Sequence, residues 1–181
     1  MLSPLGLDPA HPFPQLTNKS LNFIVSLKGK DAFGRDTSMA VVRAPRSLPR
    51  IIPVPDELAD GRKQFVLLST MIEHNMPRLF PGLETQGVYQ FRVTRNSDLY
   101  LADDDVADLR LALQDGLNAR DYGLAVRLEV GDDCPEKIIE FLLRQFKLGQ
   151  RDLYICHGPV NLNRLQKLPR LVDRSLSLIH I

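Results

Sequence analysis

Alternating apolar and polar residues predict the strands of this chain. Every second side chain is aliphatic or aromatic through 21–27, 89–94 and 124–130, and this period of two is typical of a strand with one face in a core. The glycine-containing segment 29–36 turns the chain after the first of these stretches into a further strand at 39–43, so we expect a hairpin there. Shorter strands are predicted at 50–52, from Gln64 onward and at 153–156.

Apolar residues that recur every three or four positions predict helices. They lie at 67–80 with a break near Pro77, at 103–117, at 135–149 and at 161–168. Pro135 suits a first helical turn, and Gly149 suits a helix end. A β-rich first third is therefore followed by alternating helices and strands. This order predicts one α+β domain, with a mixed sheet covered by helices mainly on one face.

The first 19 residues form a proline-rich arm. Four prolines in this stretch remove backbone donors and favour extended conformations at the residues before them. We therefore expect residues 1–19 to be irregular and to pack against another part of the structure.

Composition narrows the classes of partner. The chain has 23 Lys and Arg against 22 Asp and Glu, so its net charge favours neither a nucleic-acid partner nor a membrane surface, and we expect no nucleic acid. No apolar run approaches the roughly 20 residues that a transmembrane helix needs, and the start lacks the pattern of a signal peptide. Cys134 and Cys156 have no zinc-site spacing. A reducing cytoplasm is the compartment that these features favour.

Residues able to carry catalysis do not form a recognisable constellation. The four histidines have no nucleophile or base at a useful spacing, and no glycine-rich phosphate loop is present. The run 103–105 of three aspartates suits the first turn of a helix better than a magnesium site, because no further acidic motif at ligand spacing joins it. We therefore predict no catalytic, cofactor-binding or metal-binding residue in this chain.

Basic residues give the only candidate for ligand contact. Arg92 and Arg95 lie at the polar end of the strand 89–94, and guanidinium groups suit phosphate oxygens. Lys147 and Arg151 belong to the last 48 residues, from Cys134 onward, where eight basic residues face four acidic ones. These four residues are candidates for facing a polyanion. The competing interpretations are a cross-strand pair of Arg92 with a carboxylate such as Glu129, and an ordinary solvated surface for the others.

Several motifs together resemble a known family. They are His11-Pro12-Phe13-Pro14, Asn18-Lys19-Ser20-Leu21-Asn22, Leu79-Phe80-Pro81-Gly82, the segment 91–100 and Gly158-Pro159-Val160-Asn161-Leu162. In this order, from about residue 2 to 174, the chain resembles the middle (head) domain of bacterial polyphosphate kinase of the first type. The resemblance divides the chain into the arm 1–19, the head domain 20–174 and a tail 175–181. The tail departs from the family, and we interpret it as an artefact.

The resemblance also implies a function. The full enzyme moves the terminal phosphate of ATP reversibly onto inorganic polyphosphate, with magnesium and a phosphorylated histidine. In the family, the nucleotide-contacting residues and the catalytic histidine lie in the other domains. The resemblance implies that the head domain is a scaffold. Its partners would be those other domains, a second copy in a homo-oligomer, and polyphosphate. We therefore expect a cytoplasmic enzyme fragment that is inactive alone, the alternative being a free-standing interaction or polyanion-binding module with the same fold.

Overall fold

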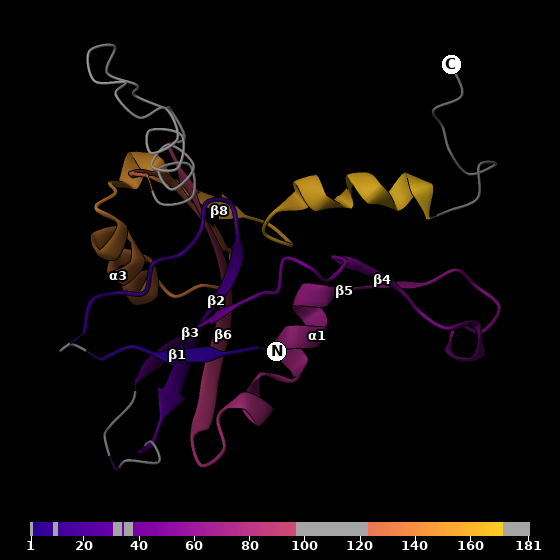
Figure 1. The fold of residues 1–181 in the computed structure, drawn as a ribbon, viewed down its shortest axis with the longest axis horizontal. Helices are drawn as coiled ribbons and strands as arrows, with labels where there is room; N and C mark the ends of the chain where they lie inside the picture. Colours follow the sequence, from indigo (N-terminus) through magenta and orange to yellow (C-terminus); the bar gives the residue numbers. More distant parts are fainter. Residues whose placement is uncertain (1, 9–10, 31–33, 35–37, 97–122, 172–181) are drawn as a thin grey trace, which may run out of the picture.

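A six-stranded mixed sheet forms the centre of the computed structural model, which describes residues 2–8, 11–30, 34, 38–96 and 123–171. The strands follow the spatial order β1-β3-β2-β6-β7-β8 (Figure 1). Their bounds are β1 Pro4–Gly6, β2 Leu21–Lys28, β3 Met39–Arg43, β6 Glu84–Arg95, β7 Ala125–Gly131 and β8 Leu153–Cys156. All neighbours are antiparallel except β7 and β8, which are parallel. The predicted α+β class and mixed sheet are confirmed.

Both faces of this sheet are buried. Ile24, Phe91 and Val93 belong to a core that α3 (Glu136–Phe146) covers, whereas Phe23 and Val25 belong to a second core on the opposite side. The second core is covered by α1 (Leu68–His74) and the 3₁₀ helix η2 (Met76–Leu79). Figure 1 shows α3 and α1 on opposite sides of the sheet. We call these sides the α3 face and the α1 face.

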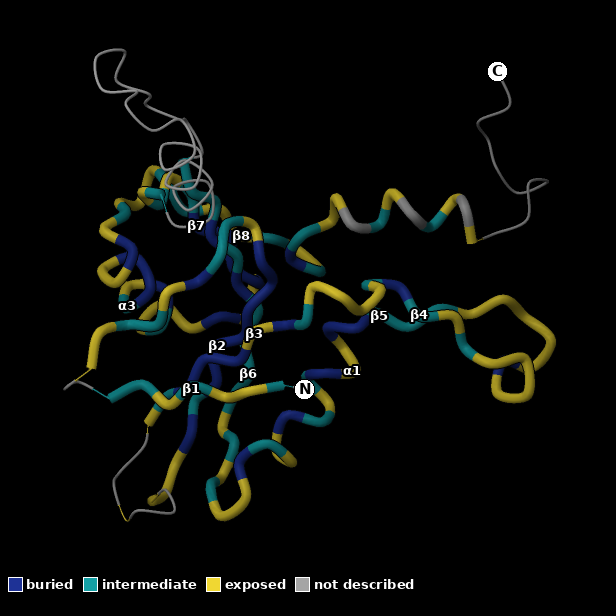
Figure 2. Tube along the Cα trace, viewed as in Figure 1, coloured by how far each residue is buried: buried dark blue, intermediate teal, exposed yellow. Residues whose placement is uncertain are grey.

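The expectation of helices mainly on one face is therefore corrected for the part of the chain that the structure describes. The physical reason lies in β2, where Asn22 and Ile24 are as fully buried as Phe23 and Val25. A strand with both faces buried needs other elements packed on both sides. Here a different helix covers each face of β2. Figure 2 shows this as a continuous dark stretch along β2.

The unit β7-α3-β8 joins the two parallel strands. A parallel pair needs a crossover, and α3 supplies it while it buries Ile139, Leu142 and Phe146 against the sheet. The helix ends at Phe146 and is followed by Lys147, whose φ of 56° is left-handed, whereas the sequence predicted Gly149 as the terminating residue. A short 3₁₀ helix, η3 (Gln150–Asp152), then leads into β8.

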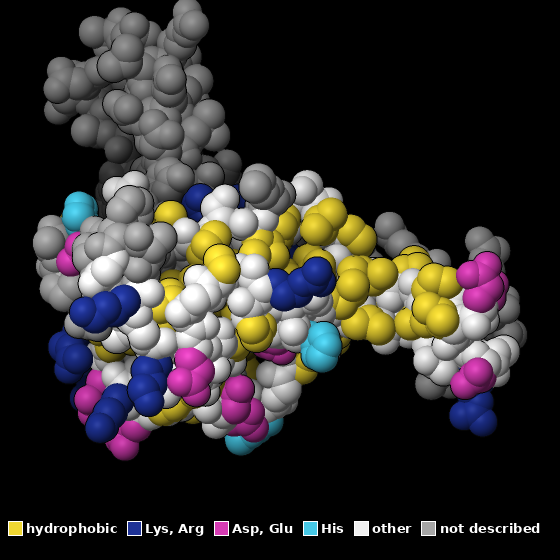
Figure 3. All heavy atoms as spheres, turned by 90° about the horizontal axis from the view of Figure 1, so that it is seen from below, with side chains coloured by type: hydrophobic (Ala, Val, Ile, Leu, Met, Phe, Trp, Pro, Cys, Tyr) yellow, Lys and Arg dark blue, Asp and Glu magenta, His cyan; other side chains and the backbone are white. Residues whose placement is uncertain are grey.

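A second, two-stranded sheet extends from the body as a projection (Figure 1). It pairs β4 (Ile51–Pro53) with β5 (Phe65–Leu67), and the 3₁₀ helix η1 (Asp56–Leu58) lies between them. Hydrophobic side chains gather along this projection in Figure 3. The 3₁₀ helix η4 (Leu162–Arg170) follows β8.

The proline-rich arm is partly regular, which differs from the expectation for residues 1–19. Pro4–Gly6 forms β1 at one edge of the sheet, where a proline without an N–H group is tolerated. Leu16 is fully buried, and the ring of Phe13 packs edge-on against Phe146. The predicted helix 103–117 and the tail 175–181 lie outside the described residues.

Candidate functional site

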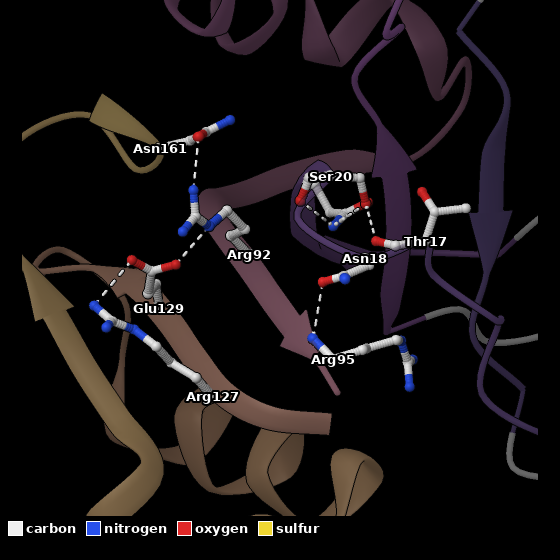
Figure 4. Close-up of polar contacts among 9 residues, drawn as sticks. Thr17, Asn18, Ser20, Arg92, Arg95, Arg127, Glu129 and Asn161 are labelled. Atoms are coloured by element: carbon white, nitrogen blue, oxygen red, sulfur yellow. Dashed lines mark hydrogen bonds and ion pairs between the residues drawn. The ribbon is translucent and has the colours of Figure 1, made fainter. Parts of the chain in front are cut away.

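Arg92 lies in a charged network on the α1 face. Its Nε donates to Glu129 Oε2 over 2.5 Å and its Nη1 donates to Asn161 Oδ1 over 2.7 Å. Glu129 Oε1 also accepts a hydrogen bond from Arg127 Nη2 over 3.1 Å (Figure 4). The predicted pairing of Arg92 with Glu129 is confirmed.

Strand register creates this network. Arg92 stands directly opposite Glu129 in the β6–β7 ladder, and Arg127 lies two residues along β7 on the same face. Tyr154 stands opposite Glu129 in the next ladder, and its ring lies 3.7 Å from the Arg127 guanidinium carbon. One nearly buried carboxylate, with 9% of its side chain exposed, thus serves two guanidinium groups. Of the two arginines, Arg127 is the more exposed, with 42% of its side chain accessible against 16% for Arg92.

Arg95 points to the α3 face and holds backbone groups. Its Nε donates to Leu16 O over 2.9 Å and its Nη1 donates to Gly123 O over 2.8 Å. Its own N–H donates to Asn18 Oδ1 (Figure 4), and its guanidinium lies 5.9 Å from the centre of the Phe146 ring. Arg95 therefore ties the arm to the end of β6.

Lys147 and Arg151 are both exposed, on the segment that joins α3 to β8. The structure thus separates the four predicted residues. Lys147 and Arg151 face solvent. Arg95 donates hydrogen bonds to the arm on the α3 face, and Arg92 lies on the opposite face of the sheet. They do not form a single site.

The described histidines lie beside a carboxylate or are exposed, and the two cysteines are wholly or partly buried. His157 Nδ1 lies 2.9 Å from Asp132 Oδ2, His11 lies beside Asp8, and His74 is exposed, while His180 is outside the described residues. Within the described ranges, no group of three potential metal ligands is close enough to hold an ion. Burial raises the pKa of Cys134 to about 12, and burial also raises the pKa of Cys156.

Two side-chain contacts were not predicted from the sequence. Gln90 Nε2 donates to Glu73 Oε1 over 2.7 Å and so links β6 to α1, and Asn161 accepts from Arg92 across 69 positions of sequence. Burial raises the pKa of Glu73 above its usual 4.5; the hydrogen bond from Gln90 opposes this effect, and the charge of Asp133 adds to it. Periodicity within one segment carries no signal for such partners, because each belongs to a distant element.

The sequence matches the family described as polyphosphate kinase middle domain over residues 1–168. This chain belongs to that family. The middle domain is 55% identical over 174 residues to a polyphosphate kinase of Neisseria meningitidis serogroup C, covering 96% of this chain and 25% of the relative. A polyphosphate kinase of Pseudomonas syringae pv. tomato is 54% identical over 165 residues, covering 91% of this chain and 22% of that protein. The middle domain thus spans about a quarter of the length of these curated relatives.

A solved structure shares the fold of the middle domain. The crystal structure of polyphosphate kinase from Porphyromonas gingivalis aligns with a TM-score of 0.69 and 22% sequence identity, covering 93% of this chain and 23% of the other. This likeness supports the α+β assignment.

In the ranges that the structure describes, none of the helices has the length and apolar character required to cross a membrane.

Proposed function

We propose that this chain serves as the scaffold domain of a cytoplasmic bacterial polyphosphate kinase. That enzyme would transfer the terminal phosphate of ATP reversibly to inorganic polyphosphate, with magnesium. The observation that carries the proposal is the family match over residues 1–168 together with 55% identity to a relative four times as long. The same identity favours the enzyme domain over a free-standing module that shares only the fold.

A scaffold role agrees with how the charged side chains are used. Arg92, Glu129 and Asn161 hold β6, β7 and the entry of η4 together, and Arg95 fixes the arm. Groups that already hold protein atoms position the surrounding elements and have few donors left for a substrate. In this proposal, the elements so positioned support the other domains of the enzyme and a second subunit.

Lys147 and Arg151 are the side chains proposed to face polyphosphate. Both are exposed, and Arg144 is exposed nearby at the end of α3. Arg92 and Arg95, the other two candidates, act on this surface only indirectly, because their guanidinium groups donate to protein acceptors.

Incubation of the 181-residue chain with labelled ATP and magnesium tests the proposal. We expect neither polyphosphate nor acid-labile label on the protein, because the sequence has no glycine-rich phosphate loop and no described histidine belongs to a metal-binding group. Supplying the flanking regions of a family member should restore polyphosphate synthesis. Label that disappears in His157→Gln would contradict the scaffold role, since His157 beside Asp132 is the described histidine closest to a nucleophile–base pair.

A further inference from the structure

A cavity of about 290 Å³ opens where β3 ends, and nothing described above uses it. Its polar lining consists of Ser3, Thr17, Ser20, Arg43 and Arg46. The volume is roughly ten times the 30 Å³ or so that one water molecule occupies in the liquid. The cavity is therefore large enough for a small hydrated anion.

Sheet topology brings these residues together from three segments. β1 and β2 are both antiparallel to β3, so the residues before β1 and before β2 lie beside the residues that follow β3. Ser3 precedes β1, Thr17 and Ser20 precede β2, and Arg43 is the last residue of β3. The position of the cavity is thus fixed by backbone pairing on two of its sides.

Part of the lining is held in place by protein contacts. Arg46 Nη2 donates to Asn18 O over 2.7 Å, and Ser20 Oγ donates to Thr17 O over 2.8 Å (Figure 4 shows the Thr17–Ser20 turn). Asn22 Nδ2 donates in turn to Ser20 O over 2.9 Å. These bonds fix the shape of the turn that forms one wall.

Three side chains of the lining, Ser3, Thr17 and Arg43, have donors without a partner among the described residues. Arg43 is exposed, and its guanidinium makes no hydrogen bond or ion pair with any residue that the structure describes. The hydroxyls of Ser3 and Thr17 likewise have no partner among the described side chains and backbone groups. None of the described lining residues is acidic. A guanidinium fork beside two hydroxyl donors, with no competing carboxylate in the described lining, matches the oxygens of a tetrahedral oxyanion.

We propose that this cavity binds a phosphate group, with Arg43 as the principal charged contact and Thr17 and Ser3 as hydroxyl donors. Arg46, whose position is set by Asn18, contributes positive charge to the wall. The phosphate belongs either to free inorganic phosphate or to a unit of a short polyphosphate. Where the phosphate belongs to a polyphosphate, the inference rests on the proposed function. It uses neither the exposed face at Lys147 and Arg151 nor any catalytic group, so the two proposals can fail separately.

Titration of the isotope-labelled 181-residue chain, followed by amide NMR shifts, tests the site. The two probes are inorganic phosphate and tripolyphosphate, each at low salt. We expect saturable shifts at residues 17–20 and at residues 43, 44 and 46, since Pro45 has no amide proton. Saturation by inorganic phosphate identifies the free ion as sufficient, whereas saturation by tripolyphosphate alone identifies the chain as the ligand.

Arg43→Gln should weaken this binding at least tenfold without changing the fold, because the side chain is exposed and unpaired among the described residues. Arg62→Gln is the matched control, since Arg62 is exposed on the projection between β4 and β5. The double variant Lys147→Gln with Arg151→Gln should leave the shifts of the cavity residues unchanged. This result is expected whether or not the surface at Lys147 and Arg151 binds polyphosphate. Equal binding by Arg43→Gln and Arg62→Gln, or no saturable shift with either probe, would overturn the proposal.

Discussion

Arg92 and Arg95 differ in role because three positions along a strand place two side chains on opposite faces. Arg92 meets Glu129 on the α1 face, whereas Arg95 meets backbone carbonyls and Phe146 on the α3 face. The guanidinium group thus forms an ion pair in Arg92, whereas in Arg95 it donates hydrogen bonds that hold the arm in place. What each arginine does is decided by its acceptor rather than by its residue type.

Phe91 and Gln90 test the register of β6 directly. Phe91 is fully buried beside Phe146, so Phe91→Ala should lower the free energy of unfolding by about 3 to 5 kcal/mol through lost burial and the cavity left behind. Gln90 does not point away from the protein, as period two with one buried face predicts, but donates to Glu73 on the α1 face. Gln90→Ala should therefore cost about 1 kcal/mol. Chemical denaturation measures both, and a larger loss at Gln90 would mean that the register is wrong.

Glu73 should make stability depend on pH. Because the pKa of this carboxyl is raised in the folded protein, the folded state holds the proton more tightly than the unfolded chain. The free energy of unfolding therefore decreases as pH rises from below 4.5 through the raised folded pKa. Glu73→Gln keeps an oxygen to accept from Gln90 but removes the titration.

Urea denaturation of the wild type and Glu73→Gln from pH 4 to pH 8 measures this difference. The wild type should lose stability relative to the variant as pH rises, and other carboxyl groups cancel in the comparison. A difference that stays constant with pH, or that grows in the opposite direction, would show that Glu73 has an ordinary pKa in the folded protein.

At the scale of elements, α3 illustrates how a helix end is chosen. Its C-terminal residue is followed by Lys147 in the left-handed conformation, whose N–H donates to Arg144 O, and Leu148 N–H donates to Leu143 O. This is the bonding of a helix C-cap that usually has glycine in the left-handed position. Gly149, with φ of −101°, needs no glycine-specific conformation.

Lys147→Gly should therefore stabilise the protein by about 0.5 to 1 kcal/mol, because it removes the strain of a side chain in the left-handed region. Gly149→Ala should change stability by less than about 0.5 kcal/mol, since an added Cβ meets only ordinary contacts. Thermal or chemical unfolding of the two variants decides where the helix ends. A clear loss in Gly149→Ala together with no gain in Lys147→Gly would restore Gly149 as the terminating residue.

At the scale of the whole molecule, the exposed basic face near the end of α3 predicts a salt-dependent interaction. Polyphosphate should bind the chain weakly, and affinity should fall steeply with added salt because ions are released on binding. Lys147→Gln combined with Arg151→Gln should weaken the binding and flatten its salt dependence. Isothermal titration at several salt concentrations measures both. Unchanged affinity in the double variant would identify these residues as an ordinary solvated surface.

Local patterns were sufficient for much of the architecture. The strand at 153–156 and the strand at 39–43 have the predicted bounds, and the helix that breaks near Pro77 divides into α1 and η2. These features follow from neighbouring residues, because alternation, helical spacing and proline act over a few positions. The ion pair of Arg92 with Glu129 could also be predicted, because two strands with matching polar positions are enough to suggest it.

The sequence by itself predicted most of the strands and helices that the structure describes, although not β1, and its motifs indicated the family. The tertiary structure alone decided that β2 is buried on both faces, that Arg95 fastens the arm, and that Ser3, Thr17 and Arg43 line one cavity. Each of these depends on which distant segments pair with β2, β3 and β6, and pairing partners are chosen by the total burial and hydrogen bonding of the sheet. That choice is a property of the assembled strands, so no single stretch of the chain contains it.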